Sequence, residues 1–329
     1  MDYNFVIDMR GDRRYEYIAK RLINLGYEVF PYGGGGGKNT VDGVDLTDSA
    51  SVGFGSSVNG INSKNFIAGN EINAANPENF STENAVNAAN YKNFGDAADF
   101  RNHGNSVADV ADVVYIFPPS LRLIDSEAER LIDGATVFAF TQNASTADIL
   151  SKKRIKFVNV FDEEGFACKN AMITADGALM LVAENTEIVF ADMKILIIGF
   201  GRVGKALAKS FKALSCKVDV LTFDGSEYAA APLLSDGQYR SFGDLRFDEY
   251  DAAINTVPAR LINKHIAARF KEDVFLLELA SEPGGFDREA LKKSGVNFVR
   301  ATGLPAKAAP VSAGKILLES IAAHLNIRV

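Results

Sequence analysis

Short apolar runs alternate with segments of helical period through most of the chain. The run at 5–7 is followed by apolar residues at helical spacing over 18–25, and a second run begins at Tyr27. Gly26 stands between them, where a left-handed helix cap is expected. Strand, helix and strand in this order indicate half of a parallel α/β unit.

The same alternation resumes at Asp112. Apolar runs at 113–117, 136–140 and 155–160 are typical of strands, with a helical segment between the last two. Together with the first two strands they predict a flavodoxin-like first domain, in which helices cover a parallel sheet.

The run at 194–198 has no polar alternation, which is typical of a central strand covered on both faces. A helical segment at 203–214 and a strand at 217–221 complete a βαβ unit, and further strands are expected at 252–258 and 275–281. This succession predicts a second doubly wound parallel sheet, of the Rossmann type.

The last helical segment, 312–325, carries apolar residues on one face. We expect that face to pack into the core of the first domain; the alternative is that it makes a homo-oligomer. The chain is therefore predicted to be α/β, with two doubly wound parallel-sheet domains and a C-terminal helix that returns to the first. The predicted bounds are 1–175 for the flavodoxin-like substrate domain, 176–305 for the dinucleotide-binding domain and 306–329 for the returning helix.

Residues 33–107 interrupt the first domain with a segment rich in Gly, Asn, Ser and Ala. The segment opens on five consecutive glycines and contains a 14-residue repeat, in which the sequence at 73–76 returns at 87–90. Each copy offers too few apolar side chains to offset the backbone entropy of ordering it. We expect a flexible surface insert; the alternative is an appendage that binds a partner.

The sequence Gly-Phe-Gly-Arg-Val-Gly follows the 194–198 strand directly. Gly199 permits the tight turn, Gly201 lets a pyrophosphate approach the backbone, and Gly204 lets helix and strand pack closely. Arg202 and Val203 begin the helix, whose N-terminal amides attract phosphate. In this strand–turn–helix–strand context the fingerprint predicts a bound nicotinamide dinucleotide.

The choice between NAD and NADP stays open. An acid is expected at the end of the second strand of an NAD-binding domain, and Thr222 falls at that position. Asp219 lies within the strand and is expected to face solvent, whereas Asp224 could reach the ribose from the loop. The sequence places no arginine next to the site to favour NADP.

Ligands of open α/β sheets bind outside the carboxyl ends of the strands. Asn255, Thr256, Val257 and Ser281 end the 252–258 and 275–281 strands. We therefore expect these residues to line the cofactor or the substrate.

Thr174 is a candidate N-cap for a helix whose first turn holds Asp176. Ala175, Leu179 and Val182 would form its apolar face. We expect this helix to run from the first domain to the second.

Composition narrows the function classes further. A net charge of −7 argues against an electrostatic nucleic-acid binder. No stretch approaches the roughly 18 apolar residues of a membrane span, and Asp2 and Asp8 interrupt any N-terminal leader, so we expect a cytoplasmic protein. Cys168 and Cys216 indicate no disulfide framework, and no Cys/His cluster indicates a metal.

Several longer motifs resemble the A subunits of bacterial dipicolinate synthases. The resemblance covers the chain except 33–107 and includes Gly-Asp-Arg at 11–13. Its strongest portion is 194–315, with the fingerprint, Ile-Asn-Thr-Val-Pro at 254–258, Leu-Ala-Ser-Glu-Pro-Gly-Gly at 279–285, Gly-Leu-Pro-Ala-Lys-Ala-Ala-Pro at 303–310 and Ser-Ala-Gly at 312–314.

This resemblance implies oxidation of a dihydrodipicolinate-type ring to pyridine-2,6-dicarboxylate with reduction of NADP or NAD, in a sporulating bacterium. It also implies the fold of the 2-hydroxyacid dehydrogenases and, for a partner, a flavoprotein B subunit. Three departures stand out. The segment 170–177 lacks the Ser and Pro of the family pattern and has Asp in place of Glu. Residues 33–107 are inserted. The arginine at the end of the second strand of the dinucleotide-binding domain is missing.

A small dicarboxylate substrate needs cations and at most a weak base. Arg13, after the first strand, and Lys307, in a Pro/Ala-rich loop, are the candidate carboxylate ligands. Thr174 and Asp176 are candidate substrate contacts or a weak base. None of the histidines, His103, His265 and His324, is expected to be catalytic.

Two other functions stay open. The chain could be another NAD(P)-dependent two-domain dehydrogenase, acting on an amino or hydroxy acid. It could also be a non-catalytic nucleotide-binding sporulation protein, in which the insert binds a partner.

Overall fold

The structure is a computed structural model, and its packing divides the chain into two units. One unit is formed by residues 1–166 and 310–329, and the other by residues 167–309. The described residues are 3–8, 12–32, 40–41, 44–45, 113–118, 123–140, 143–289, 291 and 295–329.

The first unit is built on a five-stranded parallel sheet with the strand order β2-β1-β5-β6-β7, which is the flavodoxin-like order predicted. In the inserted segment, β3 (Thr40–Val41) pairs antiparallel with β4 (Val44–Asp45). The 14-residue repeats lie outside the described residues. The sheet strands are β1 (Asn4–Ile7), β2 (Glu28–Pro31), β5 (Val113–Ile116), β6 (Thr136–Phe138) and β7 (Lys156–Val158).

Helices cover both faces of this sheet because its side chains alternate between two cores. Phe5 and Ile7 of β1 pack with α1 (Arg13–Asn24) and α12 (Pro310–Leu325). Val6, between them, faces the opposite core, which includes α4 (Asp125–Arg130) and α5 (Ala144–Lys152). The last chain segment therefore belongs to the first core, as predicted.

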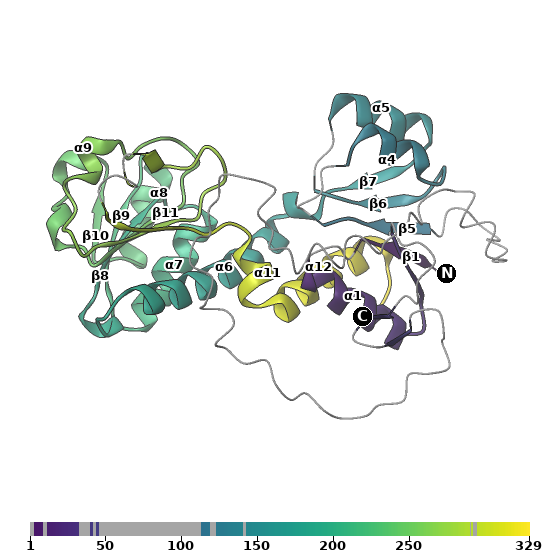
Figure 1. The fold of residues 1–329 in the computed structure, drawn as a ribbon, viewed down its shortest axis with the longest axis horizontal. Coiled ribbons are helices and arrows are strands. Elements are labelled where there is room, and N and C mark those ends of the chain that lie inside the picture. The colour runs from purple at the N-terminus through teal and green to yellow at the C-terminus, as the bar shows by residue number, and fades with distance from the viewer. Residues whose placement is uncertain are drawn as a thin grey trace. The chain divides into compact units, whose positions relative to one another are not determined.

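Helices α1 and α12 run side by side (Figure 1). A Cβ atom added to Gly314 of α12 would lie 2.8 Å from the backbone oxygen of Arg14 and 2.9 Å from Cδ1 of Tyr17. Only a glycine lets the two helices approach this closely, because any side chain would displace the α1 backbone.

The second unit contains a six-stranded parallel sheet in the order β10-β9-β8-β11-β12-β13. This is the predicted doubly wound Rossmann order. Its strands are β8 (Lys194–Ile198), β9 (Lys217–Leu221), β10 (Gly237–Tyr239), β11 (Ala252–Asn255), β12 (Phe275–Glu278) and β13 (Asn297–Arg300).

Two cores again flank the sheet. Ile195 and Ile197 pack on one face with α6 (Glu164–Asn185) and α7 (Arg202–Ala213), while Leu196 and Ile198 face the other. The remaining helices are α8 (Gly225–Ala230), α9 (Lys264–Ala267) and α11 (Leu304–Ala308), with 3-10 turns at Val160–Asp162, Phe190–Asp192, Ala231–Leu233, Phe242–Asp244 and Phe247–Glu249.

Helix α6 begins earlier than predicted. It starts at Glu164, so Thr174 lies in its interior and is not an N-cap, and Asp176 is not in its first turn. The Thr174 hydroxyl instead donates to the backbone oxygen of Asn170 at 2.9 Å, a bond that helix-interior threonines commonly make.

In the described part of the chain, α6 alone is long and apolar enough to cross a membrane by length and composition. Ala175, Ala178 and Val182 of this helix are fully buried in the core of the second unit. Core helices of soluble proteins have the same composition, so this feature is weak evidence for a membrane span.

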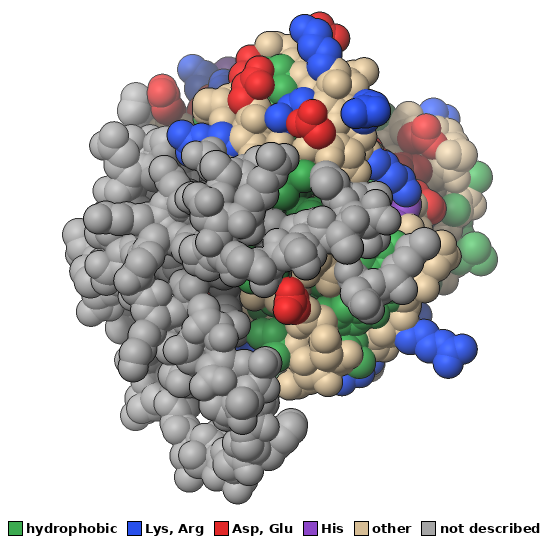
Figure 2. All heavy atoms as spheres, turned by 90° about the vertical axis from the view of Figure 1, so that its right-hand side faces the viewer, with side chains coloured by type: hydrophobic (Ala, Val, Ile, Leu, Met, Phe, Trp, Pro, Cys, Tyr) green, Lys and Arg blue, Asp and Glu red, His purple; other side chains and the backbone are tan. Residues whose placement is uncertain are grey.

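Charged side chains of both signs are interspersed on the surface in Figure 2. Over the whole chain, 42 Asp and Glu outnumber 35 Lys and Arg. Among the described side chains in this view, positive charges do not gather into a broad basic surface of the kind that binds a nucleic-acid backbone.

Candidate functional site

The turn after β8 is shaped by a glycine that no other residue could replace. Gly199 has a φ of +93°, which L side chains rarely adopt. A Cβ atom there would lie 2.5 Å from Oγ1 of Thr256 and 2.6 Å from Cγ2 of Val257. The turn therefore brings the end of β8 directly against the end of β11.

The other two fingerprint glycines have different roles. A Cβ on Gly204 would lie 2.1 Å from the backbone oxygen of Gly199, so this position holds α7 tightly against the turn. A Cβ on Gly201 would meet only Oε1 of Glu227, at 3.6 Å. Gly201 therefore leaves open space in front of the N-terminus of α7, whose first amides have no partner within the helix.

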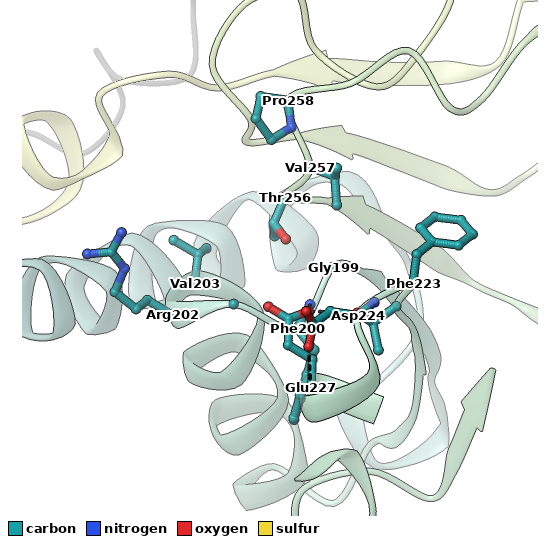
Figure 3. A pocket seen from close by; sticks show the side chains of 12 residues that line it. Gly199, Phe200, Arg202, Val203, Phe223, Asp224, Glu227, Thr256, Val257 and Pro258 are labelled. Carbon is teal, nitrogen blue, oxygen red and sulfur yellow. Dashed lines mark hydrogen bonds between the residues drawn. The ribbon is translucent and has the colours of Figure 1, made fainter. Parts of the chain in front are cut away.

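This open space is a cleft of about 440 Å³. Seven of the ten predicted cofactor residues line it: Gly199, Gly201, Arg202, Val203, Thr222, Thr256 and Val257. Its other lining residues are Phe200, Phe223, Asp224, Glu227 and Pro258. Figure 3 shows Glu227 directed toward the glycine turn, with Thr256 and Val257 on the opposite side.

Sequence reasoning missed Glu227, which comes from α8. Its Oε2 accepts a 2.6 Å hydrogen bond from the Thr222 hydroxyl and a 3.2 Å bond from the Phe200 amide. The pattern Asp-Gly-Ser-Glu at 224–227 was an available signal, because Asp followed three residues later by Glu is typical of a helix start.

Asp224 lines the cleft, in agreement with its expected reach toward the ribose, whereas Asp219 differs from expectation. Asp224 caps α8, accepting hydrogen bonds from the Ser226 hydroxyl and from the Ser226 and Glu227 amides, and these bonds lower the pKa of its carboxyl group. Asp219 is buried and does not face solvent, because its Oδ2 accepts a 2.8 Å bond from the Tyr250 hydroxyl and lies 3.2 Å from Nζ of Lys194.

Arg240 lies close to Asp224 and α8, although the sequence placed no arginine next to the site. The guanidinium of exposed Arg240 lies 5.4 Å from the centroid of the Tyr228 ring on α8. Its charge contributes to the lowered pKa of Asp224, although less than the hydrogen bonds do.

Asn255 does not line the cleft. It is fully buried, and its Nδ2 donates to Oε1 of Glu278 at 2.7 Å and to the backbone oxygen of Val257 at 2.9 Å. Its Oδ1 accepts from the Val257 amide at 3.2 Å. Asn255 therefore holds Val257 and its neighbour Thr256 in place from behind.

Ser281 is exposed and is not among the residues that line the cleft. Its neighbour Glu282 accepts hydrogen bonds from Arg288 and from Arg300, and these bonds lower the pKa of the Glu282 carboxyl group. The Arg300 side chain is 8% exposed, whereas that of Glu282 is 65% exposed.

None of the four predicted catalytic residues is among those that line the cleft. Arg13 is exposed at the start of α1, and the neighbouring Arg14 is buried in a bidentate pair with Asp12. Lys307 is exposed on α11, so the prediction that it lies in a loop is wrong. Asp176 is exposed on α6 and Thr174 is half-buried.

Neither of the two described histidines is among the residues that line the cleft. His265 is exposed on α9, and Nε2 of His324 lies 2.5 Å from Oε1 of Glu163; His103 lies outside the described residues. Among the described side chains, no group of three or more His, Cys, Asp or Glu could hold a metal ion.

No protein-family model matches the chain. Over 187 residues it is 29% identical to the A subunit of dipicolinate synthase from Bacillus subtilis (strain 168), a match that covers 55% of this chain and 61% of that protein. The match thus spans less than two thirds of the relative's length.

Two solved structures of dipicolinate synthase A subunits match the fold of this chain over nearly its whole length. The crystal structure of the dipicolinate synthase A subunit from Bacillus halodurans matches with a TM-score of 0.70 and 20% identity, covering 100% of both chains. The corresponding structure from Bacillus subtilis matches with a TM-score of 0.68 and 20% identity, covering 99% of this chain and 96% of that one. The resemblance to the A subunit of dipicolinate synthase is confirmed.

The fold that this chain shares with these dipicolinate synthase structures also occurs in dehydrogenases. A D-lactate dehydrogenase from Treponema pallidum matches with a TM-score of 0.56 and 14% identity, covering 99% of this chain and 98% of that one. The chain therefore shares its two-domain fold with this dehydrogenase.

Proposed function

We propose that the protein is an NAD(P)-dependent dehydrogenase of the dipicolinate synthase type, which oxidises dihydrodipicolinate to dipicolinate during sporulation. The observation that carries this proposal is the glycine-shaped cleft at the carboxyl end of β8. Positions 199 and 204 admit no Cβ, whereas a Cβ on Gly201 would meet only Oε1 of Glu227, at 3.6 Å. The resemblance to the A subunit of dipicolinate synthase supplies the reaction.

The residues present fit a dinucleotide. Gly201, Arg202 and Val203 would hold the pyrophosphate at the N-terminus of α7, where amide hydrogens and the helix dipole favour anions. Thr256 and Val257 would contact the cofactor from the end of β11. A bound nicotinamide dinucleotide would supply the hydride acceptor for oxidation of the dihydropyridine ring, which also releases one proton as it becomes aromatic.

This chain's own contribution to the chemistry is positioning. Aromatisation of the ring supplies driving force, so holding the substrate in the correct orientation provides much of the catalysis. Arg13 and Lys307, both exposed, are proposed to bind the two carboxylates. Asp176 is proposed as a substrate contact or weak base on α6, and Thr174 as a contact through its oxygen, because its proton is donated to Asn170.

The proposal includes a partner, the flavoprotein B subunit, and a location in the cytoplasm of a sporulating cell. The resemblance to the A subunit of dipicolinate synthase supports both.

The test is to incubate the purified full-length protein with a dihydrodipicolinate-generating system and NADP or NAD, with and without a flavoprotein B subunit. We expect pyridine dicarboxylate absorbance to appear together with cofactor reduction. Cofactor binding without turnover, even with the flavoprotein present, would instead support a non-catalytic nucleotide-binding protein. Turnover of an amino or hydroxy acid alone would support another dehydrogenase.

Gly201→Val isolates the cofactor site. The valine would fill the space through which the pyrophosphate approaches, so binding should be lost. Gly225→Ala is the matched control, because a Cβ at Gly225 meets nothing within 4 Å. Unchanged cofactor affinity in Gly201→Val would contradict this placement of the pyrophosphate.

A further inference from the structure

Thr222, directly after β9, and Glu227 of α8 line the same cleft. In Rossmann domains the residue at the end of the second strand faces the adenosine ribose, and an acid there accepts hydrogen bonds from the ribose hydroxyls. Here Thr222 occupies that position, buried and uncharged. The strand itself therefore supplies no carboxylate.

A carboxylate reaches this end of the cleft from the following helix instead. Oε2 of Glu227 accepts a 2.6 Å hydrogen bond from the Thr222 hydroxyl and a 3.2 Å bond from the Phe200 amide. Bonds to two different elements fix the carboxylate between the end of β9 and the glycine turn, as Figure 3 shows. Because Oε2 makes both bonds, Oε1 is left for a ligand, and it lies near the open face of Gly201.

The charge of Asp224 adds to that of Glu227. Hydrogen bonds from the Ser226 hydroxyl and the Glu227 amide hold the pKa of the Asp224 carboxyl below its usual range, so this group is ionised at neutral pH. Asp224 also lines the cleft. A phosphate on the ribose 2′ oxygen would therefore meet two carboxylates, and such like-charge contacts reduce affinity strongly.

Arg240 is the cation that could offset this repulsion. Its guanidinium lies over the Tyr228 ring, on the same helix as Glu227, and its charge acts on Asp224. Arg240 is not among the residues that line the cleft, whereas Glu227 and Asp224 are. A 2′-phosphate on the ribose would thus meet the carboxylates of Glu227 and Asp224 rather than the guanidinium of Arg240.

On the basis of the dinucleotide-binding function proposed above, we infer that Glu227 selects NAD(H) against NADP(H). It takes the place of the missing acid at the end of β9: Oε1 accepts a hydrogen bond from a ribose hydroxyl, and the same charge rejects a 2′-phosphate. Thr222 is a positioning residue, because its hydroxyl orients the Glu227 carboxylate.

The test compares dissociation constants of NADH and NADPH for the full-length protein, measured by cofactor fluorescence or calorimetry without substrate. Wild type should bind NADH at least about tenfold more tightly, the ratio that about 1.4 kcal/mol produces. Glu227→Gln keeps the shape and removes the charge, so the ratio should fall toward one through tighter NADPH binding. Thr222→Val should also lower the preference for NADH over NADPH, because the Glu227 carboxylate loses the hydroxyl that orients it.

Glu187→Gln is the matched control, because Glu187 is exposed and does not line the cleft. Equal affinities in wild type, or a ratio that Glu227→Gln leaves unchanged, would overturn this inference while the dinucleotide function stands. The inference would also be overturned if wild type bound NADPH more tightly than NADH and Arg240→Ala selectively lost NADPH affinity. If wild type bound neither cofactor, the proposed function would fail and this inference with it.

Discussion

Asn255 donates a 2.7 Å hydrogen bond to Glu278, and both side chains are buried at the ends of neighbouring strands, β11 and β12. The Glu278 carboxylate also accepts bonds from the amides of Ala280, Gly285 and Phe286. This buried carboxylate thereby fixes the loop after β12 without any positive charge among these partners.

Glu278→Gln should destabilise the second unit and loosen this loop. A glutamine amide nitrogen cannot accept a hydrogen bond, so buried N–H donors lose their acceptor, at about 1–3 kcal/mol each. We expect a lower unfolding temperature and faster hydrogen exchange at the Gly285 and Phe286 amides. Glu187→Gln, on the surface, should change neither. Unaltered exchange at Gly285 would show that Glu278 does not hold the loop.

Gly204→Ala tests the close packing of α7 on the glycine turn. The new Cβ would lie 2.1 Å from the backbone oxygen of Gly199, and overpacking of this kind costs about 1–3 kcal/mol or more. Thermal unfolding should show a lower transition temperature, together with weaker cofactor binding because the turn moves. Gly225→Ala should unfold like wild type, and equal stability of the two variants would refute this role for Gly204.

The two cysteines should differ in reactivity. Cys168 is exposed, whereas Cys216 is buried, and burial raises the pKa of the Cys216 thiol to about 11. An aromatic disulfide reagent at mildly alkaline pH should therefore modify Cys168 rapidly and Cys216 only after unfolding. Cys168→Ser should remove the rapid phase, and a rapid phase that persisted in this variant would contradict the burial of Cys216.

The raised pKa of the Cys216 thiol also predicts that the stability of the protein depends on pH. The folded state favours the neutral thiol of Cys216, so its pKa lies above the usual 9.0. This contribution is fully present below pH 9.0 and is lost as the pH rises toward about 11. Unfolding curves of wild type should show this loss over that interval, and Cys216→Ala should lose less stability there.

Glu282→Gln should lower stability slightly. The substitution removes the negative charge that accepts hydrogen bonds from Arg288 and the largely buried Arg300. Because Glu282 itself is exposed, the effect should stay below about 1 kcal/mol. Its carboxyl pKa is lowered, so the contribution is present above the usual 4.5 and lost as the pH falls below it. A decrease in stability that is the same in acid and at neutral pH would contradict this assignment.

The sequence predicted both sheets because their central strands are continuous apolar runs. The strands β8 and β9 have the predicted bounds. Two strands were missed, β10 (Gly237–Tyr239) and β13 (Asn297–Arg300), and both lie at the edges of the sheet. Their residues are half-buried or exposed, so no apolar run marks them.

The lining of the cleft was predicted where backbone geometry decides it, at Gly199 and Gly201. It was missed where a side chain reaches in from another element, as Glu227 does from α8. Asn255 is the opposite case. This polar residue at a strand end was expected to face a ligand, but its side chain donates a hydrogen bond to the buried Glu278 carboxylate. Only the three-dimensional packing distinguishes the two cases.

The return of α12 to the first unit has a consequence for biosynthesis. Residues 1–166 share a core with residues 310–329, and Gly314 lies against α1. The ribosome makes α1 before residues 167–309 and α12 after them, so this core must wait for its closing helix while residues 167–309 emerge. Chains usually complete their domains from the N-terminus onward, but here the first unit begins before the second and is finished after it.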